Sequence, residues 1–294
     1  MKYRSFVLLL CVLLNNLYGD NTVYSDPDYI RTMMEWTSEA VPVISIGDDI
    51  GYRRFLIGGM VEVRNERRFN QEIFPNHNWR GIGKFQALLL KHQRKDWQFS
   101  IYSDLRHESA HPTMGIVENT VKACEMIYDH NYRRMILNAL SVGSSITRSK
   151  AKDLFTFQGY FHFFFLSKNT PELTGSKLGE GFGISAGSQW QHTINNAPLD
   201  FYISLYGRHI FNSKKRAQGK LYSGEGSELI ETVVLYPVMH HVNTISIQSG
   251  LLHQFGKKGR KAGVFLKYLY GNPFGFIDSR DKRSIASMGF EFYH

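Results

Sequence analysis

Residues Ser284 to His294 read S-I-A-S-M-G-F-E-F-Y-H, and this stretch indicates the fold of the whole chain. Apolar and aromatic residues fall on every second position: Ala286, Met288, Phe290 and Phe292. A period of two is the pattern of a β-strand with one apolar face. Strands of outer-membrane barrels need two unlike faces, because one meets lipid and the other meets the lumen. An aromatic strand of this kind at the C-terminus therefore predicts an outer-membrane β-barrel.

The same alternation recurs along most of the chain. It is clearest at Leu154–Ser167, where five phenylalanines share one face, and it repeats at Leu199–Phe211 and Phe182–Trp190. Further candidate strands are 41–47, 53–64, 82–93, 97–109, 116–128, 132–145, 229–239, 241–255, 262–271 and 284–294. These thirteen segments exceed by one the even number that a single-chain bacterial barrel requires. We therefore predict an all-β fold, an antiparallel up-and-down transmembrane barrel of about 12 strands over residues 41–294.

The residues before this barrel predict export. Residues 1–19 carry a basic start and an apolar core of ten residues, Ser5–Leu14, which is typical of a secretory signal peptide. Residues 20–40 show no alternation, and we interpret them as a periplasmic lead segment. After signal removal Cys124 is the one remaining cysteine, so no intramolecular disulfide is expected.

The composition and net charge indicate which kinds of molecule the protein contacts. The formal net charge is +9, but an exported basic chain meets anionic lipid headgroups rather than nucleic acid. Aromatic residues make up 14% of the chain and suit the girdles at the two membrane interfaces. We expect outer-membrane localisation, contact with outer-membrane lipid, recognition by the barrel-assembly machinery through the C-terminal strand, no nucleic-acid partner and no cofactor.

The string His107-Glu108-Ser109-Ala110-His111 matches H-E-x-x-H, which on a helix marks a zinc peptidase. The residues around it predict a strand instead, because Trp97, Phe99 and Ile101 alternate with polar residues. Along a strand the two histidines would lie about 13 Å apart, too far to share one zinc ion. We therefore predict no metal site here and keep the zinc peptidase as a remote alternative.

On a strand, His107 and Ser109 suggest a different function from zinc binding. Residues two apart leave the same face, and this face also carries the apolar Trp97, Phe99 and Ile101. The His-x-Ser pair on the outer wall resembles the outer-membrane phospholipase A and lipid A deacylase families. That resemblance implies ester hydrolysis with Ser109 as nucleophile and His107 as base. Asn119, or alternatively Glu118, could orient the imidazole. The departure is Ala110, where the lipases usually carry Asn.

The chain also resembles an uncharacterised family of bacterial outer-membrane barrels. That family carries H-x-S-x-H followed by Gly, here His107, Ser109, His111 and Gly115. It also tends to carry Pro-x-Gly-aromatic near its end, here Pro273, Phe274, Gly275 and Phe276. The departures are Pro112 and the lack of a clear acidic pair after Gly115. This resemblance implies an outer-membrane protein and supplies no activity.

Three function classes remain open from the sequence. We favour an outer-membrane barrel of undetermined activity, either a structural or surface protein or a narrow channel. The alternative is an outer-membrane lipid esterase that uses the Ser-His pair, and the third is the zinc peptidase. His240, His241 and His253 could form a cation or proton site, but neighbours in a strand point to opposite faces, so hydrogen bonding is the simpler role.

Overall fold

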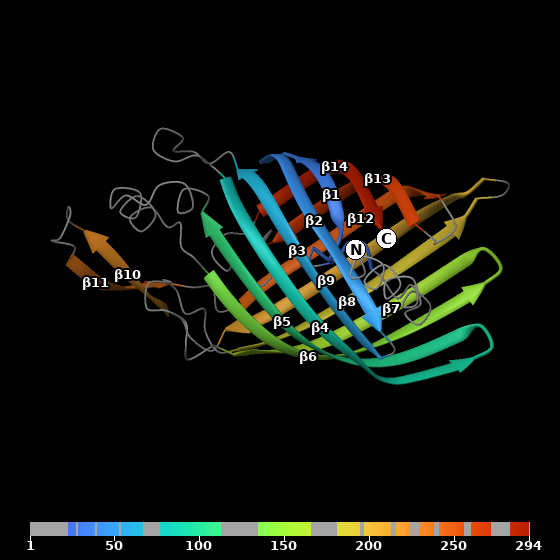
Figure 1. Cartoon of the computed structure of the whole chain (residues 1–294), viewed down its shortest axis with the longest axis horizontal. Helices are drawn as coiled ribbons and strands as arrows, with labels where there is room; N and C mark the ends of the chain where they lie inside the picture. Colours follow the sequence, from blue (N-terminus) through green and yellow to red (C-terminus); the bar gives the residue numbers. More distant parts are fainter. Residues whose placement is uncertain are drawn as a thin grey trace, which may run out of the picture.

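The computed structural model describes residues 23–27, 29–38, 40–52, 54–66, 77–112, 135–165, 181–194, 197–212, 216–223, 230–237, 241–255, 260–271 and 283–293. Its strands are β1 (Thr32–Thr37), β2 (Ala40–Tyr52), β3 (Phe55–Glu66), β4 (His77–Arg94), β5 (Trp97–Pro112), β6 (Met135–Lys150), β7 (Asp153–Phe165), β8 (Gly181–Thr193), β9 (Leu199–Asn212), β10 (Arg216–Ser223), β11 (Ile230–Pro237), β12 (His241–Phe255), β13 (Arg260–Gly271) and β14 (Arg283–Tyr293). All but β10 and β11 close into one barrel (Figure 1).

The barrel is antiparallel and has twelve strands, as predicted. Neighbours follow the chain order except that β9 pairs directly with β12, while β10 and β11 form a separate two-stranded sheet. The barrel closes where β1 pairs with β14, from Thr32↔Phe292 to Thr37↔Ser287. Among the described residues, no helix has the length and apolar character needed to cross a membrane.

The predicted strand list differs from the structure at two positions. Segment 229–239 is wrong as a barrel strand, because Ile230–Pro237 is β11 and pairs only with β10 among the described strands. The barrel also begins earlier than residue 41. Thr32–Thr37, inside the expected lead segment, is the closing strand β1. Segment 116–128 and the signal-peptide residues 1–19 lie outside the described residues, so those predictions stay open.

Along most barrel strands an apolar, exposed outer face alternates with an inner face that carries the buried polar side chains together with some buried apolar ones. On β8 the exposed Phe182 and Ile184 alternate with the buried Ser185 and Gln189. The outer wall exposes large hydrophobic side chains, and the exposed fraction of Ile46 reaches 69%. Buried polar side chains line the interior, among them Glu62, Arg80, Gln86, Asp104, Glu108, Ser204, Gln248 and Glu291. This is the reverse of a water-soluble protein and fits a wall that faces lipid.

The connections sort to opposite ends of the barrel. At one end the strands are joined by short turns, such as Lys95–Asp96 and Ala151–Lys152, in which Lys95 and Ala151 have positive φ angles of 53° and 54°. We call this the short-turn end. The connections 67–76, 113–134, 166–180, 213–240 and 272–282 all leave from the other end, the long-connection end. Short turns face the periplasm and long loops the outside in such barrels.

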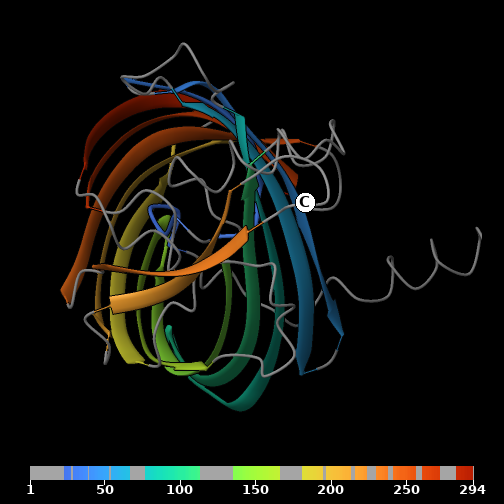
Figure 2. The ribbon, with the colours of Figure 1, turned by 90° about the vertical axis from the view of Figure 1, so that its left-hand side faces the viewer.

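Residues 23–27 and 29–31, which precede β1, lie inside the barrel (Figure 2). We call these residues the lumen segment. The backbone N–H of Tyr24 donates to Gln189 Oε1 at 2.9 Å, and Ser25 Oγ lies 2.7 Å from Ser204 Oγ. Since buried polar groups need partners, these bonds fix the segment against the inner face of β8 and β9.

Aromatic rings and a buried ion pair complete the packing of this segment. Tyr24 packs on Tyr202 and Tyr293 with ring centroids 4.6 and 4.7 Å apart. Arg31 lies 3.4 Å from the carboxylate of Glu291, and both side chains are almost fully buried. Gln248 donates to the same carboxylate at 3.0 Å. The lumen segment is therefore bound to β9, β12 and β14 near their short-turn ends.

Replacing Glu291 tests the buried ion pair. Glu291→Ala leaves the Arg31 guanidinium in the lumen without its carboxylate, and breaking a buried pair costs about 3–5 kcal/mol. We expect the unfolding midpoint in urea, followed by tryptophan fluorescence of the barrel in detergent micelles, to fall accordingly. Lys150→Ala, which removes an exposed charge at the short-turn end, should change the unfolding free energy by about 0.5 kcal/mol or less. Equal stability of wild type and Glu291→Ala would contradict the structure.

Removing the lumen segment tests whether it blocks the barrel. A variant that lacks residues 23–30 keeps β1 and loses the Tyr24 and Ser25 contacts, so the lumen should become more permeable. We expect low ionic conductance for the full-length protein in planar bilayers and a clear increase for the variant. Equal conductance of the two proteins would mean that the segment does not obstruct the lumen.

Candidate functional site on the outer wall

The H-E-x-x-H string lies on strand β5, as its alternation predicts. His107 is exposed on the outer wall, whereas the next residue, Glu108, is fully buried in the lumen. The Glu108 carboxylate forms ion pairs with Arg80 at 2.6 Å and with Arg106 at 2.9 Å. A zinc peptidase needs its glutamate beside the metal-binding histidines on a helix. Strand geometry puts His107 and Glu108 on opposite sides of the wall, so the string has no peptidase geometry here.

His107 has a partner on the neighbouring strand. Its Nδ1 lies 2.9 Å from Oδ1 of Asn138, the residue directly opposite on β6. Because an amide oxygen accepts, this bond assigns the proton to Nδ1 and leaves Nε2 as a lone-pair nitrogen. Asn138 is thus a hydrogen-bond partner of the His107 ring, and the prediction that Asn119 or Glu118 orients this ring stays open. Both of those residues lie outside the described residues, as do Gly115, Pro273 and Gly275.

Ser109 lies two residues after His107 on β5, and the structure describes its backbone. Its backbone pairs with Gly81 on β4 and Ile136 on β6, in register with the neighbours of His107. The period of two gives Ser109 the same outward parity as Leu105 and His107. The side chains of Ser109 and His111 are not among those described. The predicted outward direction of His107 is confirmed, and contact between Ser109 and His107 stays a prediction.

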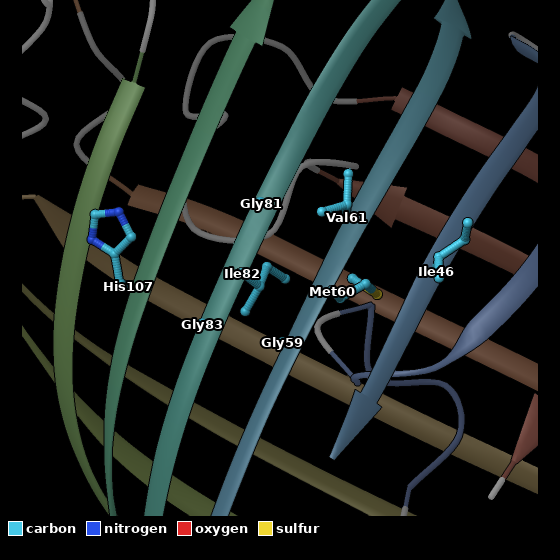
Figure 3. Close-up of a pocket in the computed structure, with 8 residues that line it drawn as sticks. All are labelled: Ile46, Gly59, Met60, Val61, Gly81, Ile82, Gly83 and His107. Carbon is cyan, nitrogen blue, oxygen red and sulfur yellow. The ribbon is translucent and has the colours of Figure 1, made fainter. Parts of the chain in front are cut away.

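A shallow hollow of about 340 Å³ opens on the outer wall beside His107 (Figure 3). The lining residues come from four neighbouring strands, β2 to β5: Ile46, Gly59, Met60, Val61, Gly81, Ile82, Gly83 and His107. Behind it, Met60 and Ile82 pack with Ile30 of the lumen segment. Of the described residues that line the hollow, His107 is the one that is ionisable, and most of the others are apolar.

Three glycines on neighbouring strands create this hollow, because the strand register brings them side by side. Gly59 pairs with Gly83, and Gly83 pairs with His107, so one outward row crosses three strands with two side chains missing. Gly81, in the next row, pairs with Ser109. A Cβ added at Gly83 would meet no atom within 4 Å, so this glycine is not required by crowding. These glycines therefore leave open space on the outer wall beside His107.

Two other histidine arrangements escaped the sequence analysis. On the far wall, Nδ1 of His209 lies 2.7 Å from Oδ1 of Asn243, which repeats the His107–Asn138 geometry. Its parity neighbour two residues on is Phe211 rather than serine. The repeat means that a His-Asn bond alone does not define a catalytic site. The distinguishing features at His107 are Ser109 and the hollow.

The other arrangement lies in the lumen. His162 on β7 is buried, with Nδ1 2.8 Å from Ser141 Oγ and Nε2 2.8 Å from Ser185 Oγ. Its two nitrogens thus bond serines of the strands on either side, which satisfies a buried imidazole. Only the strand register, which joins residues far apart in the sequence, could have revealed it.

Comparisons with known proteins give distant structural similarity only. No protein-family model matches the sequence, and no curated protein matches it significantly. LpxR from Salmonella typhimurium aligns over 99% of this chain and 96% of its own, with 10% identity and a TM-score of 0.45. OmpT, an outer membrane protein of Vibrio cholerae, aligns over 90% and 95%, with 9% identity and a TM-score of 0.38. These similarities are too distant to bear on activity.

Proposed function

We propose that this chain is an outer-membrane barrel that hydrolyses an ester bond of a membrane lipid at its outer wall. The observation that carries the proposal is the glycine-lined hollow beside His107 on the lipid-facing side, where the ring also contacts Asn138 at 2.9 Å. In this role Ser109 is the nucleophile, His107 the general base, and Asn138 the positioning residue for the imidazole.

The chemistry follows from the proton positions. With Nδ1–H of His107 donated to Asn138, Nε2 accepts the hydroxyl proton of Ser109 while Oγ attacks the acyl carbonyl. The tetrahedral intermediate expels the alcohol of the lipid, which takes that proton from His107. Water, activated by the same nitrogen, then hydrolyses the acyl-serine and restores the free hydroxyl. Acylation and deacylation, each taken as a whole, therefore return the imidazole to its neutral starting state.

The surroundings favour a lipid as substrate over a soluble ester. His107 leaves the barrel on the face that exposes Leu105 and Phe85, so a substrate reaches it from the bilayer. The hollow beside it has an apolar lining suited to a fatty acyl chain. Phospholipid and lipid A both carry acyl esters at such a surface, and both belong in the assay.

The lumen offers less support for a channel. The lumen segment fills the inner side of β8, β9, β12 and β14 with the Tyr24 rings and the Arg31–Glu291 pair. A filled interior fits a barrel whose work is done on its wall or surface. A structural or surface role remains the alternative to hydrolysis, and the absence of lipid turnover would select it.

Substitutions in the proposed triad test the hydrolase directly. Purified barrel in mixed micelles should release fatty acid from phospholipid or lipid A. Ser109→Ala should lower kcat by about 10⁴-fold or more, and His107→Ala by about 10²–10⁴-fold. Asn138→Ala should reduce kcat less and leave KM nearly unchanged, because Asn138 orients the base and does not bind lipid.

The far wall supplies a matched control for these variants. His209→Ala and Asn243→Ala remove a His-Asn bond of the same geometry that lacks an adjacent serine. Both control variants should keep wild-type hydrolysis. Intact lipid after prolonged incubation with folded wild-type protein would refute the hydrolase, and so would undiminished release by Ser109→Ala.

Filling the hollow tests its role in lipid binding. Gly83→Leu puts a side chain into the outward row between Gly59 and His107, where a Cβ meets no atom within 4 Å. The barrel should fold as before, while KM for long-chain lipid should rise at least about tenfold. Gly207→Leu is the matched control, because a Cβ there also meets nothing within 4 Å on an outward position of β9. Equal KM values in both variants would show that acyl chains do not use the hollow.

A further inference from the structure

Two imidazoles meet on the outer wall opposite the candidate site. His209 on β9 and His241 on β12 have ring centroids 5.3 Å apart, and Nδ1 of His241 lies 3.4 Å from Nε2 of His209. Both rings are accessible from outside the barrel, His241 being exposed and His209 half-buried. They lie toward the long-connection end of their strands. Nothing in the proposed hydrolysis uses this pair.

Strand register brings the two histidines together. Asn243 lies directly opposite His209, and His241 lies opposite Phe211, so the imidazoles are diagonal neighbours on one face. The chain between them leaves the barrel through β10 and β11 before β12 returns beside β9. Phe211 packs edge-on against His241 at 5.3 Å and limits the directions in which that ring can turn.

The separation of the two nitrogens matches a metal chelate. Zinc binds imidazole nitrogen at about 2.0–2.1 Å, and a tetrahedral angle at the metal then sets the two nitrogens about 3.3–3.4 Å apart. Nε2 of His209 and Nδ1 of His241 are 3.4 Å apart. Little side-chain movement would therefore bring both nitrogens to one metal ion.

A third residue sets the tautomer that a metal requires. Oδ1 of Asn243 accepts from Nδ1–H of His209 at 2.7 Å, which leaves the lone pair on Nε2. Metal-bound histidines commonly donate their other N–H to an oxygen acceptor in this way, and that bond fixes the orientation of the ring. His241 would coordinate through Nδ1 and carry its proton on Nε2.

We propose that His209 and His241 form a two-imidazole site for a divalent transition metal of the Zn²⁺, Ni²⁺ or Cu²⁺ class. Asn243 is the positioning residue, and water fills the coordination positions that face outward. Within the described part of the chain, no group of three or more His, Cys, Asp or Glu converges on a metal position. Among the described residues the site offers two protein ligands, which is consistent with an open coordination sphere and exchangeable metal.

The contrasting interpretation is a hydrogen bond between the two rings, with Nδ1–H of His241 donating to Nε2 of His209. Zinc titration separates the two, because a metal must displace that proton and bind both nitrogens. Isothermal titration calorimetry with untagged, chelator-treated barrel in detergent should give one saturable Zn²⁺ equivalent assigned to this site. His209→Ala and His241→Ala should each weaken its affinity at least tenfold, and Asn243→Ala about tenfold.

His253→Ala is the control, because it removes another exposed histidine of β12 and should leave the Zn²⁺ isotherm unchanged. His209→Gln and His241→Gln keep a polar side chain and serve if an alanine variant fails to fold. Heat-dependent gel mobility reports folding of each variant. The proposal is overturned if the folded wild-type protein shows no saturable Zn²⁺ binding, or if the isotherm survives substitution of both His209 and His241.

Discussion

The requirement that every backbone N–H and C=O be bonded governs this molecule. In a bilayer no water is available to unpaired strand edges, so a sheet must close on itself. Closure depends on a short strand, β1, which pairs with β14 on one side and β2 on the other. Once the sheet is closed, each strand has a lipid side and a lumen side. That division explains both the exposed aromatic residues and the buried charges.

The lumen meets the same requirement with side chains. Buried charges need partners, and Arg31 of the lumen segment supplies one to Glu291 of β14. Tyr24 and Ser25 add a ring and two hydrogen bonds on the inner face of β8 and β9. Among the described residues, the segment therefore packs against the lumen side of β8, β9, β12 and β14. The glycine-lined hollow beside His107 lies on the outer wall.

Local periodicity predicted most of the fold, because each barrel strand carries its own apolar face. It failed at β1, where Met33 and Glu35 share the inner face and blur the contrast. It also failed at Ile230–Pro237, which alternates like a barrel strand but pairs outside the barrel. Alternation in the sequence indicates that a strand has two unlike faces. It does not indicate which strand lies beside it.

The same limit applies to the candidate site. Parity within β5 was enough to predict that His107 points outward. Asn138 lies 31 residues away and becomes its neighbour only through the β5–β6 register, so Asn119 and Glu118 were named instead. The hollow depends on glycines of β3 and β4 standing in one row with His107. Ser109 was found by its spacing from His107, and its role as nucleophile stays a prediction.

The central claim is that His107 and Ser109 leave the barrel on its lipid side. Site-directed spin labelling tests this claim in lipid vesicles. A nitroxide is placed at each position from Leu105 to Ser109, one at a time, in a variant without other cysteines. Dissolved oxygen concentrates in the bilayer, so its collisions with each label report exposure to lipid. The account predicts high oxygen accessibility at 105, 107 and 109 and low values at 106 and 108. Uniform accessibility, or the opposite alternation, would contradict it.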